Sequence, residues 1–254
     1  ITDRCQLRCS HCFAQVAGGE PPLDLAELDR LFAQMAALGS LRLGLTGGEP
    51  LLRPDLMQIL DAAGERGLVP CMTTNGLAIS DRLARELGRR RLGWLNVSLD
   101  GATAEVHEAL RGPGTFAAAL DGMERLARHA AFSVAATITR RNLHQVESLC
   151  LLARELGAGA LVFRPLYPVG RAAARPELIP TLAQYLDAVA RAERQAEQLE
   201  MELASVHPWG PGARLESRSV VHDTFGCGAG NTVCSISCTG DVSPCSFLGP
   251  DHVG

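Results

Sequence analysis

Apolar runs rich in strand-forming residues recur along most of the chain. They cover residues 41–46, 69–74, 94–99, 132–138 and 160–163, and their starting points lie 28, 25, 38 and 28 residues apart. A strand–helix–strand unit takes about 30 residues. The spacing therefore predicts parallel strands joined by helices, and residues 1–3 (ITD) would supply the end of a sixth strand.

Between these runs, apolar residues recur at three- and four-residue steps, which predicts amphipathic helices. The first has a capping-box pattern, because Glu27 follows Asp24 by three residues. The expected helices begin near Asp24, Pro54, Ser80, Phe116, Asn142 and Thr181, with Ser80 and Asn142 as caps, and the last runs towards Leu203. The alternation predicts an α/β fold with a parallel sheet, and six units suit either an open partial barrel or a doubly wound sheet.

The character of the sequence changes near residue 205. The stretch HPWGPG (207–212) is rich in Gly and Pro, which break regular secondary structure, and Gly, Ser, Thr and Cys dominate after it. We therefore expect one domain over residues 1–205 and a small Cys-rich extension over residues 206–254. The chain begins with Ile and stops in a turn-rich stretch, so it is interpreted as a fragment lacking both ends.

Composition narrows the possible partners. A chain of 254 residues with 46% hydrophobic residues can bury a large core. Its net charge of −4 argues against a nucleic-acid-binding face, and because every basic residue is arginine, Schiff-base lysine and P-loop chemistry are excluded. No apolar run reaches the roughly 20 residues of a membrane helix and no signal peptide is visible, so we expect a soluble protein.

The nine cysteines are clustered rather than spread. A chain that can build a core does not need a disulfide framework, so clustered thiols favour metal binding in a reducing cytoplasm. Cys71 and Cys150 stand alone within apolar segments and are expected to be small core residues.

The first cluster consists of Cys5, Cys9 and Cys12, spaced C-x3-C-x2-C after the expected first strand. Active sites of parallel α/β folds gather at the carboxyl ends of strands. A structural zinc ion would need a fourth ligand such as His11. A redox pair of Cys9 and Cys12 would leave Cys5 unexplained. An iron–sulfur cluster held by three thiolates would keep one iron open for a substrate or cofactor.

Together with three further motifs, these cysteines resemble the signature of the radical S-adenosylmethionine (SAM) enzymes. GGEP (47–50) leaves the second expected strand, TTNG (73–76) closes the third and SLDG (98–101) closes the fourth. The resemblance covers residues 1 to about 170 and implies a partial (β/α)6 barrel.

The resemblance further implies that Cys5, Cys9 and Cys12 are catalytic and hold a 4Fe–4S cluster whose fourth iron chelates SAM. Electron transfer from the reduced cluster into the sulfonium would give a 5′-deoxyadenosyl radical, which abstracts a hydrogen atom from the substrate. His11 would then be a packing residue at the edge of the cluster.

By the same resemblance, SAM is expected to contact residues of the other motifs. The expected set is Gly47, Gly48, Glu49, Pro50, Asn75, Ser98, Asp100 and Arg140. The glycines would let backbone groups approach the SAM ammonium. Glu49 would accept a hydrogen bond from that ammonium or brace the turn. Ser98 and Asp100 suit the ribose diol. Arg140 would form an ion pair with the SAM carboxylate, a role that Arg141 or Arg164 would fill equally well.

A second cysteine group, CGAGNTVCSISCTGDVSPC, runs from Cys227 to Cys245. Its C-x12-G-x4-C spacing resembles the start of the SPASM extension, which binds auxiliary iron–sulfur clusters in radical SAM maturases. Turn residues at 239–241 predict a β-hairpin. The resemblance implies that Cys227, Cys234 and Cys245 ligate an auxiliary 4Fe–4S cluster with Cys238 as a bystander. A zinc knuckle of all four thiols is the alternative.

These inferences together imply an enzyme that cleaves SAM reductively and modifies a peptide or protein, supplied with electrons by a donor such as flavodoxin or ferredoxin. A small-molecule substrate such as a haem-pathway tetrapyrrole is one alternative, and a non-catalytic iron–sulfur or zinc protein is another. The segment RPLYPVGRA (164–172) is expected to enter the substrate region, where Arg164, Tyr167 and Arg171 would contact substrate or pin a loop.

Overall fold

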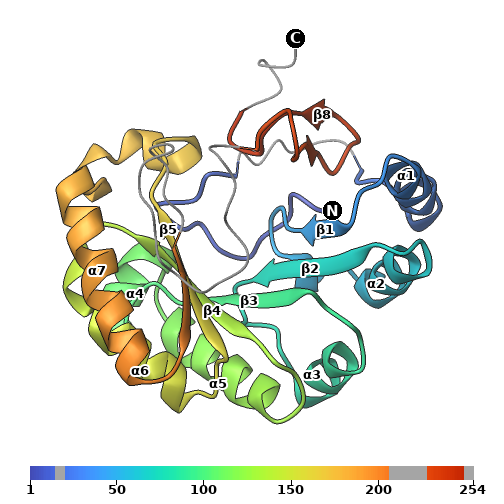
Figure 1. Cartoon of the computed structure of the whole chain (residues 1–254). Coiled ribbons are helices and arrows are strands. Elements are labelled where there is room, and N and C mark those ends of the chain that lie inside the picture. The colour runs from blue at the N-terminus through green and yellow to red at the C-terminus, as the bar shows by residue number, and fades with distance from the viewer. Residues whose placement is uncertain (15–20, 206–227, 249–254) are drawn as a thin grey trace.

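The computed structural model describes residues 1–14, 21–205 and 228–248, and most of these form one curved parallel sheet surrounded by helices (Figure 1). The strands are β1 (Arg42–Leu45), β2 (Val69–Thr74), β3 (Trp94–Ser98), β4 (Ser133–Ile138), β5 (Ala160–Pro165) and β6 (Glu202–Ser205). The helices are α1 (Leu25–Ala37), α2 (Leu56–Glu65), α3 (Asp81–Gly88), α4 (Ala104–Arg111), α5 (Thr115–Ala127), α6 (Val146–Glu155) and α7 (Leu182–Gln198).

The strands follow one another in chain order across the sheet, and each is parallel to the next. A doubly wound sheet would reverse its order at a switch point and carry helices on both faces. Here the helices form an arc around the outside of the sheet (Figure 1). Of the two architectures that the sequence left open, the structure therefore has the partial barrel.

All five strands predicted from apolar runs are present, but the sixth is not the expected one. Residues 1–3 form no strand, and Thr2 makes a single parallel bridge with Gly47. The sixth strand is β6, which lies in a segment predicted to be helical. The long helix α7 stops at Gln198, because the chain turns through Glu200, whose φ is +50°. Leu203 then lies buried in β6 beside β5.

Sequence signals located most helix starts correctly. Asp24 and Glu27 form the predicted capping box of α1, and the Ser80 side chain accepts from Leu83 N at the start of α3. Asn142 lies at the N-cap position of the 3-10 turn Leu143–Gln145 that leads into α6, but its side chain does not make the expected cap hydrogen bond. Helix α4 was not predicted.

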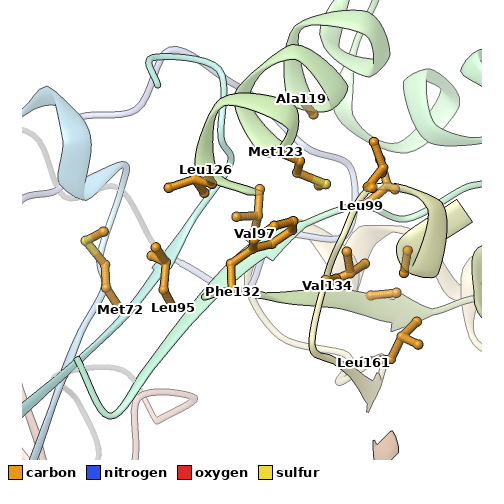
Figure 2. Packing of buried hydrophobic residues seen from close by; sticks show 14 of the residues in the cluster. Met72, Leu95, Val97, Leu99, Ala119, Met123, Leu126, Phe132, Val134 and Leu161 are labelled. Carbon is orange, nitrogen blue, oxygen red and sulfur yellow. The ribbon is translucent and has the colours of Figure 1, made fainter. Parts of the chain in front are cut away.

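The hydrophobic core lies between the outer face of the sheet and the helices. Side chains alternate along β3, and Leu95, Val97 and Leu99 pack towards Met123 and Leu126 of α5 (Figure 2). Each fully buried side chain of this size contributes about 1.5–3 kcal/mol through removal of apolar surface from water. The same alternation directs the intervening polar residues of β3 to the concave face of the sheet.

The predicted hairpin is present in the C-terminal part, with β7 (Ser235–Ile236) antiparallel to β8 (Val242–Ser243). It lies beside the N-terminal region (Figure 1), where Leu23 N donates to Cys238 O at 2.8 Å. The Phe247 ring contacts Phe13 and Tyr167, with centroid distances of 4.8 and 4.4 Å. The domain boundary near residue 205 stays a prediction, since residues 206–227 lie outside the described part.

Among the residues that the structure describes, no helix is long and apolar enough to cross a bilayer.

Candidate functional site

The cysteine loop, residues 5–12, lies across the carboxyl ends of the strands, as its sequence position predicts. Gln6 Nε2 donates to Asn75 Oδ1 after β2 at 3.3 Å. Ser10 N donates to Leu110 O of α4 at 2.8 Å. His11 Nε2 lies 3.2 Å from a carboxylate oxygen of Asp100 after β3. The fold therefore brings the loop together with residues from several strand ends.

Gly47 and Gly48 allow the segment that carries the cysteines to approach the turn after β1. Gly48 N donates to Thr2 O at 2.7 Å and Glu49 N donates to Arg4 O at 2.8 Å. A Cβ on either glycine would overlap one of these two carbonyl groups, and Gly47 has a φ of +134°. The backbone N–H groups of Gly48 and Glu49 are thus used by the protein itself, and a contact with SAM stays a prediction for both glycines.

Glu49 braces the turn, which is the second of its two expected roles. Its side chain is 1% exposed and accepts from Leu51 N at 3.0 Å, from Thr74 Oγ1 at 2.5 Å and from Asn75 N at 2.8 Å. Burial raises the pKa of Glu49, although these donors act in the opposite direction. Pro50 is buried and opens a short 3-10 turn that leads the chain away.

Asp100 connects the cysteine loop to α4 and β4. It is 0% exposed, one carboxylate oxygen accepts from Thr137 N at 2.8 Å, and the other faces Arg111 Nε and His11 Nε2. Burial acts to raise the pKa of Asp100, but the charges of Arg111 and His11 outweigh it and hold the pKa well below its usual range. Both oxygens thus have partners within the protein, and the ribose contact expected for Asp100 stays a prediction.

Asn142 and His107 fix the backbone around Asp100. Asn142 Nδ2 donates to Asp100 O at 2.8 Å and to Thr137 O at 2.9 Å, while its Oδ1 accepts from Thr139 N at 2.7 Å. These bonds replace the helix cap predicted for Asn142. Asp100 N donates to Nδ1 of His107, a fully buried residue of α4.

The stability of the protein is expected to fall below pH 6.5 because of His107. Burial lowers the pKa of His107 to about 4, so the folded state keeps the imidazole neutral while the unfolded chain binds a proton below about pH 6.5. The free energy of unfolding should therefore drop by about 2 kcal/mol between pH 7.5 and pH 5 from this group alone. Urea titrations at both pH values test this, and His107→Gln, which keeps an acceptor but does not titrate, should remove that part of the drop. An equal drop in the variant would contradict the assignment.

Arg171 and Gly170 hold the cysteine loop from the side of β5. Arg171 Nε donates to Cys9 O at 2.8 Å and Arg171 N donates to Cys12 O at 2.9 Å. Gly170 has a φ of +58°, and a Cβ there would lie 2.7 Å from Cys12 O. Of the two expected roles of Arg171, the structure shows that it pins a loop. Arg164 lies on β5, and burial lowers its pKa.

The three thiols of the loop influence one another electrostatically. Cys9 is buried and Cys5 is exposed. Burial raises the pKa of both, Cys12 raises each further, and Cys5 also raises that of Cys9. Nevertheless, within the described ranges no three Cys, His, Asp or Glu side chains converge on the position of a single metal ion.

The partner of His11 favours an iron–sulfur cluster over a zinc ion. His11, the fourth ligand that zinc would need here, is engaged with Asp100. Three coupled thiols with no local fourth ligand are the donor set of an iron–sulfur cluster with one open iron.

Two asparagine side chains each have one buried amide atom without a partner among the described residues. Asn75 Nδ2 and Asn96 Oδ1 are buried without a hydrogen-bond partner. Because Leu95 and Val97 face the helices, Asn96 and Ser98 lie on the concave face. One buried donor and one buried acceptor are therefore available to a ligand. Arg140, which was expected to meet the SAM carboxylate, is exposed, and only its backbone N–H bond to Leu178 O is defined.

The remaining cysteines divide into core and hairpin residues. Cys71 and Cys150 are buried, as expected for core residues, and burial raises the pKa of Cys150 to about 12. In the hairpin, Cys234 is exposed, and Cys238 and Cys245 are partly exposed. Cys227 lies outside the described residues, so the auxiliary ligand set of Cys227, Cys234 and Cys245 stays a prediction.

Sequence reasoning missed Gln6, His107 and Arg111. A weak signal for the last two existed, because His107 and Arg111 are four residues apart and so lie on one face of a helix. Their common partner, Asp100, was assigned another role.

Solved structures share this fold. The Streptococcus suis enzyme SuiB bound to the precursor peptide SuiA superposes with a TM-score of 0.84 at 19% identity, covering 99% of this chain and 60% of that one. The two chains therefore share their overall fold.

Sequence comparisons show the family to which the chain belongs. The mycofactocin maturase MftC of Mycobacterium ulcerans is 32% identical over 253 residues, which cover 97% of this chain and 67% of the relative. The AdoMet-dependent heme synthase of Methanosarcina barkeri is 30% identical over 275 residues, covering 98% and 75%. Residues 1–152 match the Radical SAM superfamily, and the chain belongs to that family. The chain spans about two thirds of the length of MftC.

Proposed function

We propose that the protein is a peptide maturase that cleaves SAM reductively and modifies a side chain of a peptide or protein substrate. The observation that carries this proposal is the similarity to the maturase MftC along 97% of the chain, combined with the three-thiol loop at the barrel rim. The bound cluster and SAM would supply a 5′-deoxyadenosyl radical.

Residues of this chain would bind the cluster and SAM. Cys5, Cys9 and Cys12 would ligate the 4Fe–4S cluster, and the Glu49 network would keep the turn after β1 beside it. The unpaired Asn75 Nδ2 offers a donor to SAM. Ser98, at the end of β3, would contact the ribose of SAM, and the exposed Arg140 would contact its carboxylate.

The concave face suits a ligand with both donors and acceptors. Asn96 Oδ1 is a buried acceptor that lacks a partner, and a peptide N–H group would satisfy it. The hairpin, with Cys234 and Cys245, would bind an auxiliary cluster near this face, because Phe247 packs against Phe13 at the end of the cysteine loop.

A second candidate function is modification of a tetrapyrrole. The heme synthase relative is almost as similar as MftC, at 30% identity, and the same radical step would act on a small molecule. A gene for a short peptide next to the gene of this protein would favour the first function.

The test is anaerobic reconstitution with iron and sulfide, followed by reduction with dithionite or flavodoxin in the presence of SAM. We expect 5′-deoxyadenosine to appear, and a neighbouring-gene peptide to change mass whereas a tetrapyrrole does not. A fully loaded cluster that leaves SAM intact would indicate a non-catalytic iron–sulfur protein. A changed tetrapyrrole with an unchanged peptide would favour the second function.

A further inference from the structure

Two arginines from different parts of the fold flank the cysteine loop. Arg111, at the end of α4, lies within electrostatic reach of Cys9 and Cys12. Arg171, after β5, donates to Cys9 O and acts on Cys5. Each of the three thiols therefore has a guanidinium group nearby.

The two arginines differ in how their charge is balanced. Arg111 is ion-paired with the buried carboxylate of Asp100, so the pair is close to neutral. Arg171 donates its Nε to a neutral backbone carbonyl, and it makes no ion pair with any residue that the structure describes. Arg171 thus adds an unbalanced positive charge to the loop.

The segment that carries Arg171 contacts both the cysteine loop and α4. Its backbone N–H donates to Cys12 O, and Gly170 lies so close to the loop that a side chain would not fit. The next residue, Ala172, is 0% exposed and packs with Leu110 of α4. The distance between the guanidinium and the loop is therefore set by packing on both sides.

We propose that Arg171 is a positioning residue that holds the cysteine loop and raises the reduction potential of the cluster bound there. The inference rests on the proposed function only in requiring that the loop holds a 4Fe–4S cluster. Three thiolates give that cluster a negative charge, and the electron delivered by the donor makes it more negative by one. A nearby positive charge that no carboxylate offsets stabilises the reduced state more than the oxidised one.

The experiment is a potentiometric titration of the reconstituted full chain, followed by the electron paramagnetic resonance signal of the reduced cluster. Arg171→Gln is expected to shift the midpoint of the SAM-binding cluster to a more negative potential. Arg171→Lys keeps the charge and should stay close to wild type. Arg175→Gln is the matched control, because Arg175 is exposed, lies four residues further on and pairs with Glu177 at 3.5 Å. It should leave the midpoint unchanged.

A midpoint of Arg171→Gln equal to that of Arg175→Gln would overturn the proposal, and so would an equal shift in the Gln and Lys variants. If Arg171→Gln loads less iron while its far-UV circular dichroism is unchanged, the holding role is supported, and the midpoint of its loaded fraction decides the effect on potential. The titration needs no SAM cleavage. An unchanged midpoint in an enzyme that still makes 5′-deoxyadenosine would therefore defeat this inference and leave the proposed function intact.

Discussion

Replacing Cys9 with alanine is expected to reduce the formation of 5′-deoxyadenosine by at least about 1,000-fold, which corresponds to about 4 kcal/mol of lost catalysis. Cys9 is the buried thiol of the loop, and its carbonyl is held by Arg171. Without it, two thiolates would have to retain a cluster that needs three protein ligands. The product is measured by chromatography, together with the iron content of the reconstituted protein.

Cys150→Ala is the matched control, because Cys150 is also buried but its thiol lies against Ala192 O of α7, away from the loop. It should keep iron content and product at wild-type values and lower stability by about 1 kcal/mol through the small cavity it leaves. Loss of about four irons from Cys9→Ala, with any hairpin cluster retained, is the expected pattern. A Cys9→Ala protein that still makes the product at the wild-type rate would show that the loop does not hold the cluster.

The fold was largely predictable because its signals are local. The apolar runs that became β1 to β5 and the Asp24 and Ser80 caps depend on neighbours within a few residues. Strand β6 was missed because it has only four residues and follows a long amphipathic helix without a glycine or proline. Helix α4 was missed because its eight residues bury only His107 and Leu110.

The site was predictable where spacing carries the chemistry and unpredictable where distant partners do. The C-x3-C-x2-C spacing of the cysteine loop is visible in the sequence alone. The partners of Asp100 lie 11 and 37 residues away, at Arg111 and Thr137, so the sequence could not show that its carboxylate is already occupied. The same holds for Arg171, which lies 162 residues from Cys9.

Replacing Asp100 with alanine is expected to lower the free energy of unfolding by about 3–5 kcal/mol, because it leaves the Arg111 charge buried without its partner. The change also removes the contact with His11, so iron loading of the cysteine loop should fall with stability. Urea denaturation and iron analysis of the same preparations measure both effects. Ser98→Ala is the control on the same strand end, and its effect should stay below about 1 kcal/mol, since no ion pair is broken.

The two roles considered for Asp100 make opposite predictions for this variant. A residue that only bound the ribose of SAM would leave stability unchanged and weaken SAM binding alone. A residue that ties α4, β4 and the cysteine loop together would lose stability even in the protein without SAM or iron, since its partners Arg111 and Thr137 belong to the fold. The apo protein therefore tests the structural role: an unfolding free energy of Asp100→Ala equal to that of wild type would contradict it.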